Sequence, residues 1–177
     1  MSLTIATLTA AETLALLPQL AVLLQDAVNN GAALGFLAPV TTDAATAYWQ
    51  QVAGEVGAGQ RVLLVARRPG TDEVLGTVQL DLANRPNGLH RAEVAKMMVH
   101  TSARRAGIGR QLLQALEAQA RQLGRSTLVL DTREGDGAEQ LYQSVGYQHA
   151  GRIPDYARSS DGTLHATVLY YKLLAND

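Results

Sequence analysis

Cationic residues and glycines cluster at positions 104–110, which read Arg-Arg-Ala-Gly-Ile-Gly-Arg. Apolar residues alternate as in a strand before this segment and recur at helical spacing after it, so the segment forms the turn from a strand into a helix. The amides and dipole of a helix N-terminus attract anions, and arginines add charge-assisted hydrogen bonds. Gly107 and Gly109 would let the backbone approach phosphate groups closely. The segment is typical of a pyrophosphate site, although chance or an ordinary helix start explains the pattern equally well.

The charge distribution also marks this part of the chain. The 177 residues carry a net charge of only −1, which argues against a generic nucleic-acid binder. Residues 85–110, however, hold six basic side chains against Glu93 alone, so this segment carries +5 and the rest of the chain −6. We interpret the local charge as a site for a small polyanion and expect no nucleic acid. A solvated surface and a nucleic-acid interface are the alternatives.

The residue types exclude several mechanisms. The chain has no cysteine, which rules out disulfides, thiolate metal sites and thiol nucleophiles. The histidines show no spacing typical of ligand pairs, so we predict no metal. No Lys or Arg precedes Arg61 to form the charged start of a secretory signal, and the apolar run at 14–24 is too short to span a bilayer. We therefore expect a cytoplasmic protein without a membrane partner.

Periodicity predicts a single α/β domain (α+β in some schemes) over residues 1–177. Strands are predicted at 3–8, 61–67, 74–82, 91–100, 126–131, 147–151 and 167–173, and helices at 10–30, 43–56, 108–123 and 137–145. The first helix opens with the capping-box pair Thr9 and Glu12 and should kink at Pro18. Because a helical crossover joins strands 91–100 and 126–131, these two should run parallel in a mixed sheet with helices on its faces.

Two motifs, in the order in which they occur along the chain, resemble those of the GNAT acetyltransferase superfamily. Residues 99–109 are similar to its V-x-P-x-x-R-G-x-G-x-G segment, with Thr101 in place of the proline and Arg105 in place of the first glycine. A second signature, N-x-x-A-x-x-L-Y-x-x-x-G-F/Y, is matched by residues 138–147, with Gly135 in place of the asparagine. The resemblance implies a mostly antiparallel central sheet with one parallel, splayed strand pair and helices on both faces.

Over most of the chain the resemblance extends to the tabtoxin-resistance type of acetyltransferase. The segments that carry it include Gly35-Phe36, 86–94, 130–132, 138–142 and 161–165. That type acetylates the amine of a small amino-acid-like β-lactam toxin. The resemblance therefore implies toxin or antibiotic resistance and a small acceptor, without identifying it.

The resemblance places a general base at Glu93, six residues before Val99. By the period of two, this side chain should share a face of its strand with Ala95, Met97 and Val99. An ion pair of Glu93 with Arg91 or Lys96 is the alternative. Asp131, at the end of the next parallel strand, is a second candidate, either as base or as the carboxylate that holds the substrate ammonium. Its alternative is to cap the following turn through Thr132 and its neighbours.

Tyr142 matches the family tyrosine that hydrogen-bonds or protonates the departing thiolate of CoA, and a packed aromatic of an amphipathic helix is the alternative. A phenol suits this role because its pKa of ~10 keeps it protonated at neutral pH. The resemblance also implies that an amide near Met97 polarises the thioester. The residues implied in binding acetyl-CoA are Met97, Met98, Val99, Arg104, Arg105, Ala106, Gly107, Gly109 and Arg110.

We thus expect an acetyl-CoA-dependent N-acetyltransferase that acts on the primary amine of a small molecule. Because no cysteine can form an acyl-enzyme, the amine should attack directly in a ternary complex. A non-catalytic acyl-CoA-binding or regulatory module is one alternative, and acetylation of a protein or peptide amine is another. The sequence leaves open whether the protein forms a homodimer.

Overall fold

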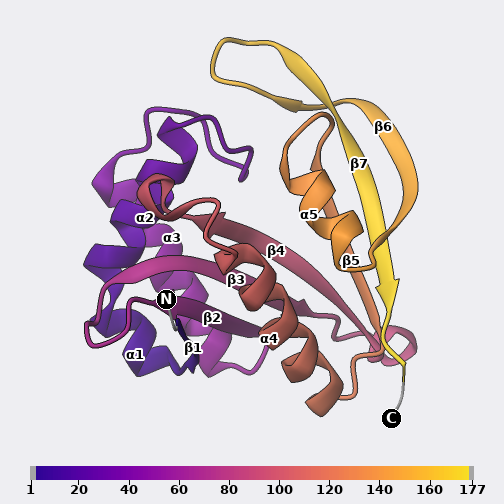
Figure 1. Cartoon of the computed structure of the whole chain (residues 1–177), viewed down its shortest axis with the longest axis horizontal. Helices are drawn as coiled ribbons and strands as arrows, with labels where there is room; N and C mark the ends of the chain where they lie inside the picture. The colour runs from indigo at the N-terminus through magenta and orange to yellow at the C-terminus, as the bar shows by residue number, and fades with distance from the viewer. Residues whose placement is uncertain (1–2, 176–177) are drawn as a thin grey trace.

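A computed structural model describes residues 3–175 as a seven-stranded sheet flanked by helices (Figure 1). The strand order is β1-β2-β3-β4-β5-β7-β6, and every neighbouring pair is antiparallel except β4 and β5. The expected mixed, mostly antiparallel sheet is confirmed. The strands are β1 (Thr4–Leu8), β2 (Arg61–Arg67), β3 (Val74–Leu82), β4 (Arg91–Val99), β5 (Thr127–Arg133), β6 (Gln148–Arg158) and β7 (Leu164–Leu173).

Helices cover both faces of the sheet (Figure 1). They are α1 (Ala10–Ala15), α2 (Leu17–Asn29), α3 (Thr42–Gly57), α4 (Ile108–Gln122) and α5 (Ala138–Ser144), with short 3₁₀ turns at Pro86–Gly88 and Thr101–Ala103. The core on one face joins α2 and α3 to the sheet through Leu24, Trp49 and Leu63. The core on the other face packs Leu112 of α4 and Tyr142 of α5 against the sheet.

The predicted first helix is two helices. The capping box is confirmed, because Thr9 Oγ1 accepts from the Glu12 amide at 3.2 Å and Glu12 Oε2 accepts from the Thr9 amide at 2.8 Å. The helix then ends at Ala15, and Pro18 occupies the first turn of α2. Proline is favoured there because the first amides of a helix have no intrahelical acceptor. The prediction of a kinked but continuous helix was therefore wrong, and the break leaves Leu14 48% exposed.

The parallel strands β4 and β5 separate after a short paired stretch. Their register runs only from Arg91 opposite Thr127 to Glu93 opposite Val129. The two strands then diverge, and α5 lies beside the divergence (Figure 1). The predicted parallel pair is confirmed, and its splay opens the sheet between the strands that carry Glu93 and Asp131.

The last two strands form a longer hairpin than the apolar pattern predicts. Strand β6 continues to Arg158 and β7 begins at Leu164, and the pairing of Ala157 with His165 and of Arg158 with Leu164 extends the hairpin beyond the predicted strands. All positions of the edge strand β6 except Gly151 are exposed, so alternation of apolar residues could not reveal it. Its backbone pairing with β7, interrupted near Asp155 with φ of 50°, defines the strand instead.

Candidate active site

The turn after β4 has a backbone suited to an anion. Arg105 and Gly107 have left-handed φ values of 63° and 76°, and Gly107 is the N-cap of α4 without a side-chain cap. A Cβ at Gly107 would meet no atom within 4 Å, so backbone conformation rather than space favours glycine here. The first amides of α4 therefore face no capping side chain. Ala106 is exposed in the same turn.

Gly109 has a packing role. A Cβ at this position would lie 2.9 Å from Cδ2 of Leu141 in α5 and 3.8 Å from Sδ of Met97. Glycine thus lets the start of α4 approach α5 closely. This contact joins the two sequence motifs, because Gly109 belongs to the first and Leu141 to the second.

The three predicted arginines differ in their contacts. Arg104 donates from Nε to the carbonyl oxygen of Val99 at 3.2 Å, which braces the turn. Arg110 donates to Oγ of Ser144 at 2.9 Å, which links α4 to the end of α5. Arg105 is exposed and makes no hydrogen bond or ion pair with residues 3–175, so its guanidinium is the one most accessible to an anionic ligand.

Strand β4 contains a bulge that reverses the faces of its residues. Thr77 of β3 pairs with Met98 and Gln79 pairs with Ala95, so Lys96 and Met97 oppose a single residue. Lys96 takes the strained φ of 51°. An extra residue in one strand shifts its alternation by one position.

The predicted common face of Glu93, Met97 and Val99 was therefore wrong. Met97 and Val99 pack with the core beneath α4, whereas Met98 joins the core beneath α2 and α3. Glu93 lies on the face opposite to its buried neighbours Ala92 and Val94, which belong to the α4 core.

Glu93 and Asp131 share one face of the sheet across the splay. Glu93 pairs with Val129 in register, and Asp131 follows Val129 by two residues on the same strand. Partial removal of water around Glu93 raises the pKa of its carboxyl group, and the negative charges of Asp131 and Asp81 raise it further. Asp81 lies directly opposite Glu93 on β3. Within residues 3–175, Glu93 forms none of the ion pairs offered as its alternative role.

Asp131 is held by a contact within the sheet. Its Oδ2 accepts from Oγ1 of Thr167 at 2.8 Å, and this hydroxyl also lies 2.9 Å from the carbonyl oxygen of Thr132. The residue sits inside β5, which continues to Arg133, and its side chain is exposed. The Asp131 side chain therefore does not cap a turn.

Tyr142 belongs to α5, and its side chain packs into the core on the opposite face of the sheet. Its ring packs at 5.8 Å from that of Tyr147 and at 6.4 Å from that of Tyr170. Burial raises the pKa of the Tyr142 phenol, and the charges of Asp136 and Asp131 add to this. Its hydroxyl donates to no acceptor among the described residues 3–175. Tyr142 is thus a packed aromatic that also keeps a protonated, unused donor.

Sequence reasoning missed the polar network beside Glu93. Tyr48 of α3 donates to Oε1 of Gln79 at 3.0 Å, and Nη2 of Arg61 contacts Oδ2 of Asp81 at 2.7 Å. Burial raises the pKa of Tyr48 to about 12. Gln79 and Asp81, polar residues in a largely apolar strand, were the available signal in the sequence.

Lys96 was considered only as a partner for Glu93. Its pKa is lowered, first by burial and then by the charge of Arg61. A Cβ at Gly35 would lie 3.4 Å from its Nζ, so the loop after α2 approaches the β4 bulge. The bulge thus points a dehydrated ammonium group into the region of the two carboxylates.

Residues 59–149 match the family model described as an acetyltransferase (GNAT) domain. The chain belongs to the GNAT acetyltransferase family. This GNAT chain is 34% identical over 111 residues to an uncharacterized N-acetyltransferase of Azospirillum brasilense, which covers 62% of the chain and 63% of the relative. The chain spans less than two thirds of the length of the curated relatives it matches.

Solved GNAT structures share the fold over almost the whole chain. A ribosomal-protein-alanine N-acetyltransferase from Brucella melitensis is 26% identical, with a TM-score of 0.78 over 97% of this chain and 99% of that one. A phosphinothricin acetyltransferase from Sinorhizobium meliloti, solved with acetyl-CoA, is 20% identical, with a TM-score of 0.79 over 99% and 90% of the two chains. The second likeness concerns the fold alone.

Neither a metal cluster nor a membrane-spanning helix is found in residues 3–175. Residues 3–175 contain no cluster of three or more His, Asp or Glu side chains placed to hold a metal ion. In the same part of the chain, no helix combines the length and apolar character needed to cross a membrane.

Proposed function

We propose that this GNAT chain transfers an acetyl group from acetyl-CoA to the primary amine of a small molecule by direct attack. The observation that carries the proposal is the placement of groups around the splay. Glu93 and Asp131 lie on one face of the sheet, while Tyr142 and the start of α4 lie on the other. An acceptor amine and a thioester would meet through the opening between β4 and β5.

The turn at 104–110 fits the pyrophosphate of the cosubstrate. Gly107 takes a left-handed conformation with open space around it, and α4 begins directly after it at Ile108. Arg105 has an exposed guanidinium that makes no hydrogen bond or ion pair within residues 3–175. The backbone of Met97, Met98 and Val99 would hold the pantetheine arm beside the bulge. When bound, acetyl-CoA supplies an activated acyl group and a thiolate leaving group.

Glu93 is proposed as the base for the acceptor. An amine with a lysine-like pKa of ~10.4 must lose a proton before it attacks, at a cost of about 4.6 kcal/mol at pH 7. A carboxylate with a raised pKa is a better base near neutral pH than an ordinary one. Partial dehydration and the charges of Asp131 and Asp81 raise the pKa of Glu93 in this way. Asp131 would hold the ammonium group beforehand, or serve as the base itself.

Tyr142 is proposed as the donor to the leaving sulfur. A thiol has a pKa of ~8.5, well below that of a phenol. Because burial raises the Tyr142 pKa further, the phenol would stabilise a thiolate mainly by donating a hydrogen bond rather than by giving up its proton. This role requires the unused hydroxyl that the structure gives Tyr142.

The sequence resemblance to the tabtoxin-resistance type of acetyltransferase supports a small acceptor, and toxin or antibiotic resistance is part of this proposal. The test measures thiol release from acetyl-CoA with amino acids, phosphinothricin, β-lactam analogues, polyamines, aminoglycosides and peptide N-termini. The proposal expects release with at least one small amine and its loss in the Glu93→Gln variant. Acetyl-CoA binding without release for any amine would instead indicate a non-catalytic binding module. Release with peptides alone would assign a protein or peptide acceptor.

A further inference from the structure

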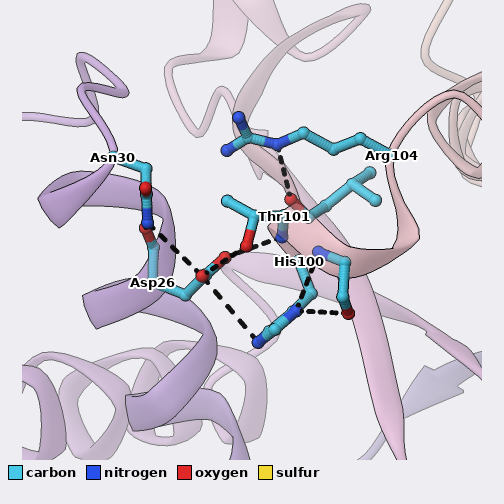
Figure 2. Close-up of polar contacts among 7 residues, drawn as sticks. Asp26, Asn30, His100, Thr101 and Arg104 are labelled. Atoms are coloured by element: carbon cyan, nitrogen blue, oxygen red, sulfur yellow. Dashed lines mark hydrogen bonds and ion pairs between the residues drawn. The ribbon is translucent and has the colours of Figure 1, made fainter.

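Asp26 of α2 binds the first residue of the turn that follows β4. Its Oδ2 accepts from the Thr101 amide at 2.8 Å, and its Oδ1 accepts from the Thr101 hydroxyl at 2.8 Å (Figure 2). His100 lies close by, with Nε2 at 3.9 Å from Oδ1. The Asp26 side chain is only 15% exposed. Both carboxylate oxygens thus accept from Thr101, and Oδ1 also accepts from Nδ2 of Asn30 at 3.4 Å.

This contact fixes the point where β4 becomes the phosphate-binding turn. Thr101 opens the 3₁₀ turn Thr101–Ala103, and Arg104 follows directly. Figure 2 shows Arg104 reaching back to the backbone beside Thr101, where its Nε donates to Val99 O at 3.2 Å. Charge-assisted hydrogen bonds from two donors to one carboxylate restrict both position and orientation.

Asp26 lies in the last turn of α2, and the helix leads directly from there into the loop that we place on the acceptor side. Arg133 of β5 donates to the carbonyl oxygen of Gly31 at 3.1 Å, and the Ala38 amide donates to Oγ of Ser160 in the β6–β7 hairpin at 2.7 Å. The same loop brings Gly35 beside Lys96. Residues 31–41 therefore contact β4, β5 and the hairpin around the splay.

We propose that Asp26 is a positioning residue that couples this acceptor-side loop, residues 31–41, to the acetyl-CoA turn. The inference rests on the proposed function. Ordering of the turn by acetyl-CoA is transmitted through Thr101 and Asp26 to α2 and the loop, so the cosubstrate prepares the acceptor side. Such coupling is reciprocal, and an acceptor would strengthen acetyl-CoA binding by the same factor.

The test combines hydrogen exchange with calorimetry on the full chain. Acetyl-CoA should slow amide exchange in residues 31–41 of the wild type severalfold. In Asp26→Asn this protection should disappear, and acetyl-CoA should bind roughly tenfold more weakly. Asp72→Asn is the matched control, because the Asp72 side chain is 87% exposed and forms an ion pair with Arg67 rather than with the turn, so the variant should leave both measurements unchanged.

Thr101→Pro separates coupling from turn geometry. Proline fits the first position of a helix, and His100 has the extended ψ of 137° that proline requires before it. The variant loses both donors to Asp26 while proline keeps the geometry of the turn, so the protection of 31–41 should disappear. Thr101→Val, which keeps the amide and the side-chain volume, should retain part of the protection.

The outcomes separate the coupling through Asp26 from the proposed function. If the wild type binds acetyl-CoA without protection of 31–41, or if Asp26→Asn and Thr101→Pro keep that protection, the coupling is refuted while the proposed function stands. If the wild type fails to bind acetyl-CoA, the proposed function is refuted, and the coupling with it.

Discussion

Lys172 of β7 joins three elements behind the helix that carries Tyr142. Its Nζ donates to both oxygens of Glu117 in α4, at 2.8 and 2.7 Å, and to the carbonyl oxygen of Val145 after α5, at 2.6 Å. The Glu117 side chain is only 8% exposed and that of Lys172 20%. Replacing Lys172 by methionine would leave Glu117 charged and unpaired in the core.

Loss of one partner from a buried ion pair costs about 3 to 5 kcal/mol, whereas replacing both by apolar groups is often neutral. We expect Lys172→Met to lower the free energy of unfolding by about that amount and Glu117→Leu/Lys172→Met to recover most of it. Urea unfolding followed by circular dichroism measures both, and Arg121→Met on the exposed side of α4 is the control. A loss below ~1 kcal/mol in the single variant, or an additive loss in the double variant, would refute the reasoning.

Four further predictions concern the site. Tyr142→Phe should lower kcat by about 100-fold with little change in acetyl-CoA affinity measured by calorimetry. Weaker binding of acetyl-CoA with an unchanged kcat would contradict the donor role. In the pH profile of kcat/KM, the fall on the acid side should lie at higher pH than an ordinary glutamate would give, because Glu93 must be ionised and its pKa is raised. Lys96→Met should move this acid-side fall to higher pH, since the Lys96 charge lowers the Glu93 pKa; an unmoved fall would exclude Glu93 as the base. Gly107→Ala should weaken acetyl-CoA binding and lower the melting temperature, because φ of 76° disfavours any side chain.

Local patterns were sufficient for most of the fold. The capping box, the strands at 61–67 and 74–82 and the helix from Ile108 all follow from residue types and spacing. The parallel pair follows from the helical crossover. These features depend on neighbours in the sequence or on one buried face, which periodicity records.

The remaining features depend on contacts between distant residues. The bulge at Lys96 leaves the composition of β4 unchanged, yet it reverses the face of every later residue in the strand. The exposed edge strand β6 is defined by backbone pairing alone. Thr101 departs from the family proline, and only the structure shows its partner, Asp26, 75 residues earlier.

Direct transfer of an acetyl group from acetyl-CoA to a small amine can be followed through the acetyl group itself. The most direct measurement incubates the chain with acetyl-CoA labelled in the acetyl group and a reactive amine, then follows the label by mass spectrometry. The account predicts that label enters the amine in step with free CoA, that none accumulates on the protein, and that Glu93→Gln slows both. Label on the protein before it reaches the amine, or CoA release without an acetylated amine, would contradict it.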